Sequence, residues 1–415
     1  MRYAHIVGWG KSAPERVVTN DEIAAFVDTS DTWIRERSGI GQRHMAGAKD
    51  SCASISIAAA LEALDVANIS PSQLGLIIVA TSTPDYAFPS TACLVQDALG
   101  ADSAGAFDLS AACSGFIYGL SMASDAIKAG SCEYALVIGA DVMTRLVNWA
   151  DRSTCVLFGD GAGAVVLQSS DQPGGVLSTI LRADGSGGDM LYVRTNFREM
   201  PANVAGQDGA AAATAPAIEE AKGIAPGHMY MNGREVFRFG VRILAGATRE
   251  IIARTGWEID QIDLLIPHQA NIRILESASK SLSLPMERFY HNIEHYGNTS
   301  AASIPIAICD AVTSGRLRPN HKVVMVGFGG GLTWASAAVE WGTPRALNRA
   351  NRTMNRVRLG LANVRSRARR VLRRVEDRVF GSIELSPAAP PAPAMPAPNG
   401  KSAPLAEGEP ETRRQ

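Results

Sequence analysis

The sequence lacks the features that define several common protein classes. No apolar run approaches the roughly 18 residues that a membrane-spanning helix needs, and the opening MRYAHIVGWGKSAPE has no signal-peptide apolar core. The six cysteines form no CxxC pair, no metal-ligand spacing and no dense disulfide framework. We therefore expect a reducing, cytoplasmic compartment, free thiols and no bound metal.

Signals for nucleotide or nucleic-acid binding are also missing. The formal net charge is only −1. The glycine-rich stretch GFGGGLTW (327–334) lacks the Lys and Ser/Thr of a phosphate-binding loop, and FGDGAGA (158–164) does not match GxGxxG. No nucleic-acid partner is expected. Glycines beside a nucleophile would instead let backbone N–H groups approach a developing oxyanion.

The chain contains an alternation of buried strands and helices that occurs twice. LGLIIVAT, EYALVIGAD and GAGAVVLQ have counterparts in IDLLIP, HKVVMVGFG and TWASAAVEW, with helical segments between them. This pattern predicts an α/β fold of two similar halves, over 1–172 and 173–343. The Ala/Gly-rich patch 205–217 is interpreted as a surface insertion.

The C-terminal part has a different character. Twelve arginines lie between positions 345 and 378, and apolar residues recur among them at helical spacing. A basic amphipathic helix is predicted over 344–380, followed by a disordered Pro/Ala-rich tail over 381–415. Three interpretations of 345–380 remain open: contact with an anionic membrane surface, contact with an acidic protein, or a solvated appendage.

Cys113 stands among unusually small residues in DLSAACSGF (108–116), between a strand and a predicted helix. Unpaired N–H groups at a helix start favour a thiolate, so we expect a lowered pKa and a nucleophilic sulfur. A closely packed helix–strand joint would favour the same small residues. The stretch alone leaves both interpretations open.

Two further segments support a catalytic interpretation. LLIPHQAN presents His268 at the carboxyl end of a buried strand, where sites of α/β proteins form, and HYGNTSAAS places Asn298 at another such joint. A lone histidine is more often structural, and Asn298 could be an ordinary helix cap. Three polar groups at equivalent joints predict an active site.

AACSGF, PHQAN and GNTSAAS together resemble the motifs of β-ketoacyl-acyl-carrier-protein synthase III, over about residues 3 to 342. The resemblance implies the thiolase fold, with duplicated α-β-α-β-α halves in a five-layered core, and a homodimer. It implies an acyltransferase that condenses an acyl-CoA primer with malonyl-acyl-carrier protein and so initiates fatty acid synthesis. No cofactor is implied beyond these thioester substrates.

The resemblance also implies a role for each motif residue. Cys113 is acylated by acyl-CoA, and His268 and Asn298 donate hydrogen bonds to the malonyl thioester oxygen as charge develops. The backbone N–H groups of Cys113 and Gly330 form the oxyanion hole for acyl transfer.

Further matches concern substrate binding. The residues matched to CoA and its pantetheine arm are Trp33, Arg37, Arg152, Phe237, Ala270 and Asn271. Phe88 matches a position that reaches across the dimer to the acyl pocket. The basic residues matched to carrier-protein docking are Arg238, Arg273 and Lys280. Ordinary packing or a solvated charge would explain each of these positions singly.

Three other interpretations of the motifs remain. A related Cys-His-Asn condensing enzyme or acyltransferase could use another acceptor, either an acyl-CoA or a secondary-metabolite intermediate. A papain-like protease shares the order Cys, His, Asn, but its signature around the cysteine is absent here. A non-catalytic scaffold would be favoured if Cys113, His268 or Asn298 were missing, and all three are present.

Overall fold

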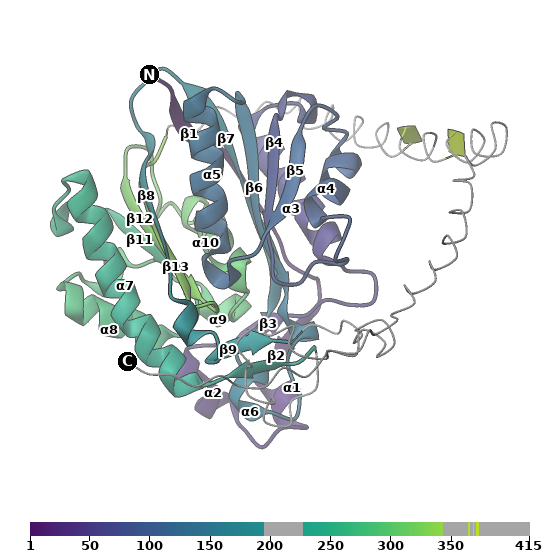
Figure 1. The fold of residues 1–415 in the computed structure, drawn as a ribbon. Coiled ribbons are helices and arrows are strands. Elements are labelled where there is room, and N and C mark those ends of the chain that lie inside the picture. Colours follow the sequence, from purple (N-terminus) through teal and green to yellow (C-terminus); the bar gives the residue numbers. More distant parts are fainter. Residues whose placement is uncertain (195–226, 343–363, 366–367, 369–370, 373–415) are drawn as a thin grey trace, which may run out of the picture. The chain divides into compact units, whose positions relative to one another are not determined.

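Two β-sheets lie side by side at the centre of the described chain (Figure 1). The computed structural model describes residues 1–194, 227–342, 364–365, 368 and 371–372. The first sheet has the order β1-β7-β6-β4-β5, in which β4 runs parallel to β5 and β6, and β7 runs antiparallel to β1 and β6. Its strands are β1 (Tyr3–Ser12), β4 (Leu76–Ala80), β5 (Gly105–Leu109), β6 (Tyr134–Val142) and β7 (Asp160–Ser170).

The second sheet repeats much of this arrangement. Its order is β11-β12-β13-β8, with β11 parallel to β12 and the other neighbours antiparallel. A parallel pair followed by two antiparallel strands occurs in both sheets, as a duplicated fold requires. The strands are β8 (Gly175–Ala183), β11 (Leu264–Pro267), β12 (Lys322–Gly329) and β13 (Thr333–Glu340).

Helices complete five layers. In Figure 1, α5 and α10 lie between the two sheets, α3 and α4 cover the outer face of the first sheet, and α7 and α8 cover that of the second. Ser51 caps α3 through a reciprocal bond with Ser54, and Gly130 ends α5 in the left-handed conformation at φ 83°. These helices are α3 (Cys52–Ala67), α4 (Thr91–Leu99), α5 (Gly115–Ala129), α7 (Gly233–Thr255), α8 (Ile272–Leu282) and α10 (Ser303–Thr313).

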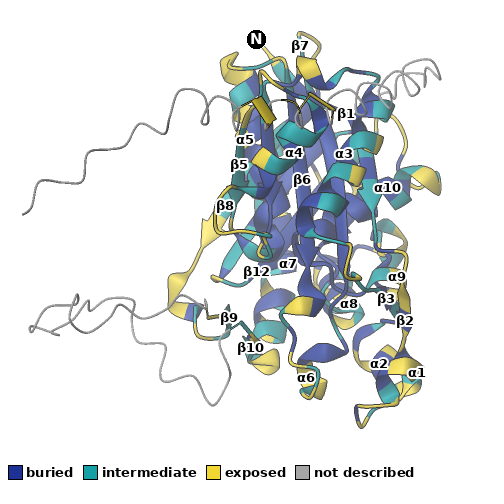
Figure 2. Cartoon of the chain, turned by 90° about the vertical axis from the view of Figure 1, so that its right-hand side faces the viewer, coloured by how far each residue is buried: buried dark blue, intermediate teal, exposed yellow. Residues whose placement is uncertain are grey.

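The apolar core is divided among the layers. One cluster joins α5 and α10 to both sheets, a second joins α3 and α4 to the first sheet, and a third joins α7 and α8 to the second. Figure 2 shows the buried residues concentrated along the strands and the helix faces turned to them. Because both sheets are covered on both faces, their strands are continuous apolar runs, as the sequence indicated.

Short elements surround the ends of the sheets where the site lies. They are β2 (Val17–Thr19), α1 (Asn20–Ala24), α2 (Asp31–Ser38), β3 (Gln42–His44), α6 (Arg152–Cys155), β9 (Leu191–Val193), β10 (Met229–Met231) and α9 (Ile293–Tyr296). The 3₁₀ turns are η1 (Pro71–Gln73), η2 (Ala112–Ser114), η3 (Met143–Arg145), η4 (Gly185–Gly187), η5 (Ile259–Gln261), η6 (Met286–Arg288) and η7 (Ser300–Ala302).

The structure confirms the predicted α/β fold. The strands of the first sheet come from residues 3–170 and those of the second from 175–340. The insertion at 205–217 and the tail at 381–415 lie outside the described residues, as does most of the segment 344–380. None of the helices described is both long and apolar enough to span a bilayer.

Candidate active site

Cys113 sits at a sharp turn between β5 and α5. Its 3₁₀ turn η2 runs directly into α5, and Ala112 takes the left-handed conformation at φ 45°. A Cβ atom on Gly329 of β12 would lie only 2.9 Å from the Cys113 backbone N and 3.1 Å from its Sγ. The glycine therefore lets the second sheet approach the nucleophile backbone directly.

The pKa of Cys113 differs from the sequence expectation. The thiol was expected to have a lowered pKa because it stands at a helix start, but burial raises the pKa of Cys113 to about 12. Cys113 is only 7 % exposed, so a thiolate there would be poorly solvated by water. The resting group is therefore a neutral thiol. The start of the helix stabilises negative charge only while that charge develops on the sulfur during the reaction.

His268 follows β11 and extends its parallel pairing, because its backbone N donates to the Val326 carbonyl at 2.8 Å. The ring packs edge-to-face against Phe328, with 5.3 Å between the centroids. It is 1 % exposed, and its Nδ1 has no hydrogen-bond partner among the described residues. Burial lowers the pKa of His268 to about 3, so the imidazole is neutral at physiological pH.

Asn298 follows the short helix α9 rather than the buried strand that the sequence indicated, and hydrogen bonds fix both its backbone and its side chain. Its backbone N donates to the Leu157 carbonyl at 2.9 Å, and its carbonyl accepts from the Gly159 N at 3.0 Å. The side-chain Oδ1 accepts from the Ser300 backbone N at 2.8 Å. An oxygen is required there because the partner is a donor, which leaves the amide Nδ2 to face the cavity.

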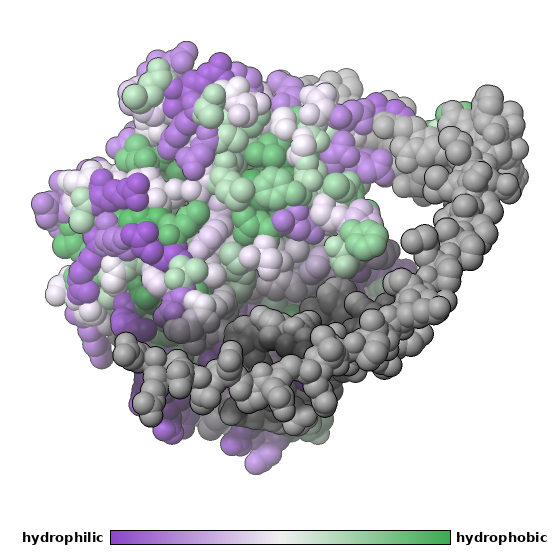
Figure 3. Space-filling model, viewed as in Figure 1, coloured by the Kyte–Doolittle hydropathy of each residue, from purple (hydrophilic) through white to green (hydrophobic). Residues whose placement is uncertain are grey.

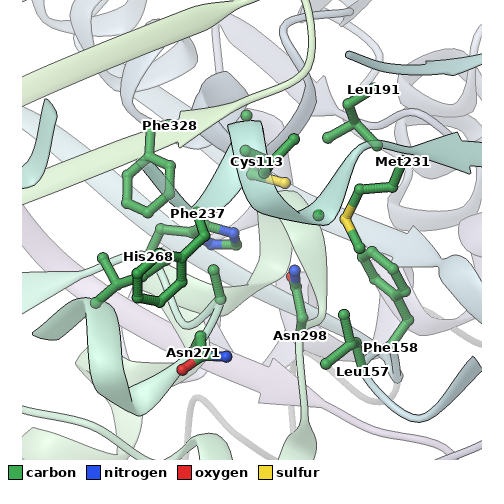
Figure 4. A pocket seen from close by; sticks show the side chains of 15 residues that line it. Cys113, Leu157, Phe158, Leu191, Met231, Phe237, His268, Asn271, Asn298 and Phe328 are labelled. Atoms are coloured by element: carbon green, nitrogen blue, oxygen red, sulfur yellow. The ribbon is translucent and has the colours of Figure 1, made fainter. Parts of the chain in front are cut away.

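The three side chains line one cavity. Figure 4 shows Cys113, His268 and Asn298 converging from separate elements, with Phe328 to one side of the imidazole. Cys113 also lines a second, largely apolar cavity together with Gly330 and Ser300. Cys113, Phe158 and Leu191 therefore contribute to both cavities. Apolar residues of the second cavity include Met143, Leu146, Phe158, Leu191 and Met229.

The residues matched to pantetheine and CoA form two groups. Phe237, Ala270 and Asn271 all line the first cavity. Trp33 lies close to two cations, with the Arg37 and Arg152 guanidinium carbons 5.7 Å and 4.9 Å from its ring centroid. The predicted grouping of an aromatic with two arginines is therefore present in the structure.

The comparisons with known proteins agree with this geometry. The model of the 3-oxoacyl-acyl-carrier-protein synthase III family matches residues 107–185, and the model of its C-terminal region matches 252–341. A β-ketoacyl-acyl-carrier-protein synthase III of Roseiflexus sp. (strain RS-1) is 46% identical over 339 residues, which cover 82% of this chain and 98% of the relative.

The chain belongs to the β-ketoacyl-acyl-carrier-protein synthase III family.

Solved synthase III structures give the same result. The Aquifex aeolicus VF5 enzyme has a TM-score of 0.72 and 42% identity, covering 81% of this chain and all of that one. A priming β-ketosynthase of the R1128 polyketide pathway has a TM-score of 0.73 and 33% identity, covering 83% of this chain and 98% of that one. The thiolase fold predicted from the sequence is confirmed.

The positions matched to carrier-protein docking in the synthase III family are exposed. Arg238 lies on α7 and pairs with Glu235, while Arg273 and Lys280 lie seven residues apart on α8. The Arg273 guanidinium lies 5.5 Å from the ring centroid of Phe237, at the cavity. Figure 3 shows hydrophilic side chains interspersed with apolar ones over this α7–α8 layer.

Phe88 does not line either cavity in this chain. Its side chain is 87 % exposed, and Tyr86 beside it is 58 % exposed. This exposure is compatible with the predicted role across a dimer, which stays a prediction. No set of three or more His, Cys, Asp or Glu side chains in the described part of the chain is placed to hold a metal ion. The absence of a cofactor also stays a prediction.

Sequence reasoning missed two residues behind the nucleophile. Ser300 lies within the motif GNTSAAS, which was interpreted only through Asn298, and its Oγ is 3.5 Å from the Cys113 Sγ. Asp141 is the last residue but one of the buried strand β6 and is fully buried. An ionisable residue that closes an apolar run was the signal available for it.

Proposed function

We propose that this synthase III condenses an acyl-CoA primer with malonyl-acyl-carrier protein to give 3-oxoacyl-carrier protein, the first condensation of fatty acid synthesis. The observation that carries the proposal is the convergence of Cys113, His268 and Asn298 on one cavity, while Cys113 also lines a second cavity. The first cavity suits an extended pantetheine arm, and the second suits the acyl chain of the primer.

In the first step Cys113 is acylated. Its sulfur attacks the acyl-CoA carbonyl, the new S–C bond forms, and the bond to the CoA sulfur breaks. The thiol proton ends on the departing CoA, so the step is neutral overall. The backbone N–H groups of Cys113 and Gly330, which borders the same cavity, stabilise the transient oxyanion. The Cys113 N–H lies in the first turn, where N–H groups have no partner within the turn, and it faces the Cys113 sulfur itself.

In the second step malonyl-carrier protein enters after CoA has left. Its terminal C–CO₂ bond breaks, and the electron pair forms an enolate whose oxygen accepts hydrogen bonds from neutral His268 and from Asn298 Nδ2. The enolate carbon attacks the Cys113 thioester and forms the new C–C bond. Cys113 departs as a thiolate and takes one proton from water, which is the proton that the overall reaction consumes.

Substrate binding follows from the surrounding residues. Trp33 and Arg152 hold the CoA adenine, and Arg37 lies on the same face of helix α2 as Trp33. The pantetheine arm is guided by residues of the first cavity, namely Phe237, Ala270 and Asn271. The exposed cations Arg238, Arg273 and Lys280 dock the acidic carrier protein. The homodimer, the cytoplasmic location and a membrane or acidic-protein contact through 345–380 stay predictions.

A carrier-protein dependence assay tests the acceptor. Pre-acylated enzyme is mixed with malonyl-carrier protein or with a second acyl-CoA, and products are identified by mass. The proposal expects a 3-oxoacyl-carrier protein from the first mixture only. A product from acyl-CoA alone would support the alternative acceptor, which the synthase III relatives do not favour.

A further inference from the structure

A buried carboxylate lies behind the nucleophile. Asp141 on β6 has no exposed surface, and its partners are hydroxyl and backbone N–H donors rather than a cation. One oxygen accepts from the Ser82 N at 2.7 Å and from the hydroxyls of Thr81 and Thr83 at 3.1 and 2.9 Å. This half of the carboxylate ties it to the loop after β4.

The other half holds the turn that carries Asn298. The second carboxylate oxygen accepts from the Ala301 N at 3.1 Å. Burial raises the pKa of Asp141, and hydrogen bonding by the nearby Ser300 hydroxyl is one of the interactions that oppose this rise. Ser300 has a φ of 51°, a conformation that non-glycine residues seldom adopt. Such a conformation persists where its surroundings determine it, and here Asn298 and Asp141 hold it from either side.

The Ser300 hydroxyl faces two acceptors with a single proton. Its Oγ lies 3.5 Å from the Cys113 Sγ, and both side chains are almost fully buried, with exposures of 2 % and 7 %. While Cys113 is a thiol, its S–H donates to Ser300, and Ser300 donates to Asp141. A thiolate has no proton to give, so it would become an acceptor that competes with Asp141 for the Ser300 proton.

We propose that Ser300 is a further catalytic residue, whose hydroxyl turns from Asp141 to the Cys113 sulfur as the thiolate forms, and that Asp141 is the residue that positions it. The rotation breaks one hydrogen bond and makes another, and no covalent bond changes. In the resting enzyme the carboxylate keeps the hydroxyl away from the sulfur and so favours the thiol. The inference rests on the proposed function, in which Cys113 is the nucleophile.

Alkylation of Cys113 by iodoacetamide tests this without any thioester substrate. The rate between pH 7 and 9 is followed by mass of the Cys113 peptide, because five other cysteines are present. Ser300→Ala and Ser300→Gly both remove the hydroxyl, and the glycine also relieves the positive φ. Ser303→Ala is the matched control, since this buried hydroxyl lies near Thr299, at 3.2 Å, rather than near the sulfur.

Both Ser300 variants are expected to alkylate about tenfold more slowly than wild type, because the thiolate loses a charge-assisted donor. The Ser303 variant should match wild type. The proposal is overturned if either Ser300 variant alkylates as fast as wild type or faster. A slow Ser300→Ala beside a normal Ser300→Gly would therefore also overturn it. Acyl-CoA loading of the same samples separates this failure from failure of the proposed function.

Asp141→Asn tests the positioning role. With the competing charge removed, the Ser300 hydroxyl is free to donate to sulfur, and alkylation should exceed that of wild type severalfold. Adding Ser300→Ala should remove most of this gain. If the double variant alkylated as fast as Asp141→Asn alone, the faster rate would come only from removal of the charge or from loosening of the structure. That result would contradict the proposed link between Asp141 and Ser300.

Discussion

Asn298 accepts a hydrogen bond from the backbone N of Ser300 through its Oδ1, at 2.8 Å. The bond fixes the orientation of the side-chain amide, so that the Nδ2 hydrogens are left for the cavity. The two polar atoms of the Asn298 side chain thus have separate tasks. The Oδ1 atom holds the turn in place, and the Nδ2 group is the donor that stabilises the enolate.

Asn298→Asp separates these tasks. The carboxylate keeps an acceptor for the Ser300 N but loses the donor and adds negative charge where the enolate forms. Decarboxylation of malonyl-carrier protein should fall about 10²- to 10³-fold. Acylation of Cys113 should fall far less, because it uses the other oxyanion hole. Stopped-flow CO₂ release and intact mass measure the two steps, and an equal loss in both would contradict the assignment.

His268 should show no titration near neutral pH. Burial lowers the pKa of His268 to about 3, so the ring stays neutral across the physiological range. NMR of the imidazole protons, assigned with His268→Asn, should show one ring with no midpoint above pH 5. A midpoint between pH 6 and 7 would mean that a charged imidazolium takes part in the reaction.

The same shift predicts a pH dependence of stability. Below the ordinary pKa of 6.5 the unfolded chain binds a proton at His268 that the folded chain refuses until about pH 3. The free energy of unfolding therefore falls as pH drops through this window. Denaturant unfolding of His268→Asn should show a shallower fall between pH 6.5 and 4. Identical slopes in both proteins would argue against a buried neutral ring.

Gly329 should be intolerant of substitution. An added Cβ would lie 3.0 Å from the Cys113 Cβ and 3.1 Å from its Sγ, so Gly329→Ala must displace the nucleophile. Because displacements of about 1 Å cost catalysis about a hundredfold, acylation should fall by at least that factor. Gly246→Ala is the control, since a Cβ there meets nothing within 4 Å. Equal acylation in both variants would refute the close approach.

Trp33 should contribute to CoA recognition through the adenine alone. The Arg152 guanidinium lies 4.9 Å from the Trp33 ring centroid, whereas an adenine between them needs about 7 Å. Arg152 must therefore move away from the Trp33 ring before the adenine can enter between them. Trp33→Ala should weaken acyl-CoA binding about tenfold, while acylation by an acyl-pantetheine, which has no adenine, should be unchanged. A matching loss with acyl-pantetheine would place Trp33 in another role.

The sequence predicted much of the site because Cys113 and His268 each follow a buried strand. Asn298 was expected at a similar joint, but it follows the short helix α9 and pairs only through an isolated bridge to Phe158. The fold nevertheless brings all three side chains to one cavity. The pKa of Cys113 was predicted in the wrong direction, because the helix end is visible in the sequence but the burial that raises the pKa is not.

Other features depend on contacts that span the chain. The Ala301 N and the Asp141 carboxylate are 160 positions apart, and no local spacing joins them. The approach of Gly329 to Cys113 likewise requires the two halves to be docked. Local patterns predicted the elements and their polar ends, whereas the bonds between halves follow only from packing.

The central claim is that Cys113 carries the acyl group between two substrates. Intact mass spectrometry of wild type and Cys113→Ala, each incubated with a panel of acyl-CoAs and then with malonyl-carrier protein, tests it directly. We predict that only wild type gains an acyl mass, and that malonyl-carrier protein then discharges it as 3-oxoacyl-carrier protein. Acylation of the alanine variant, or no acyl gain by wild type with any primer, would contradict the claim.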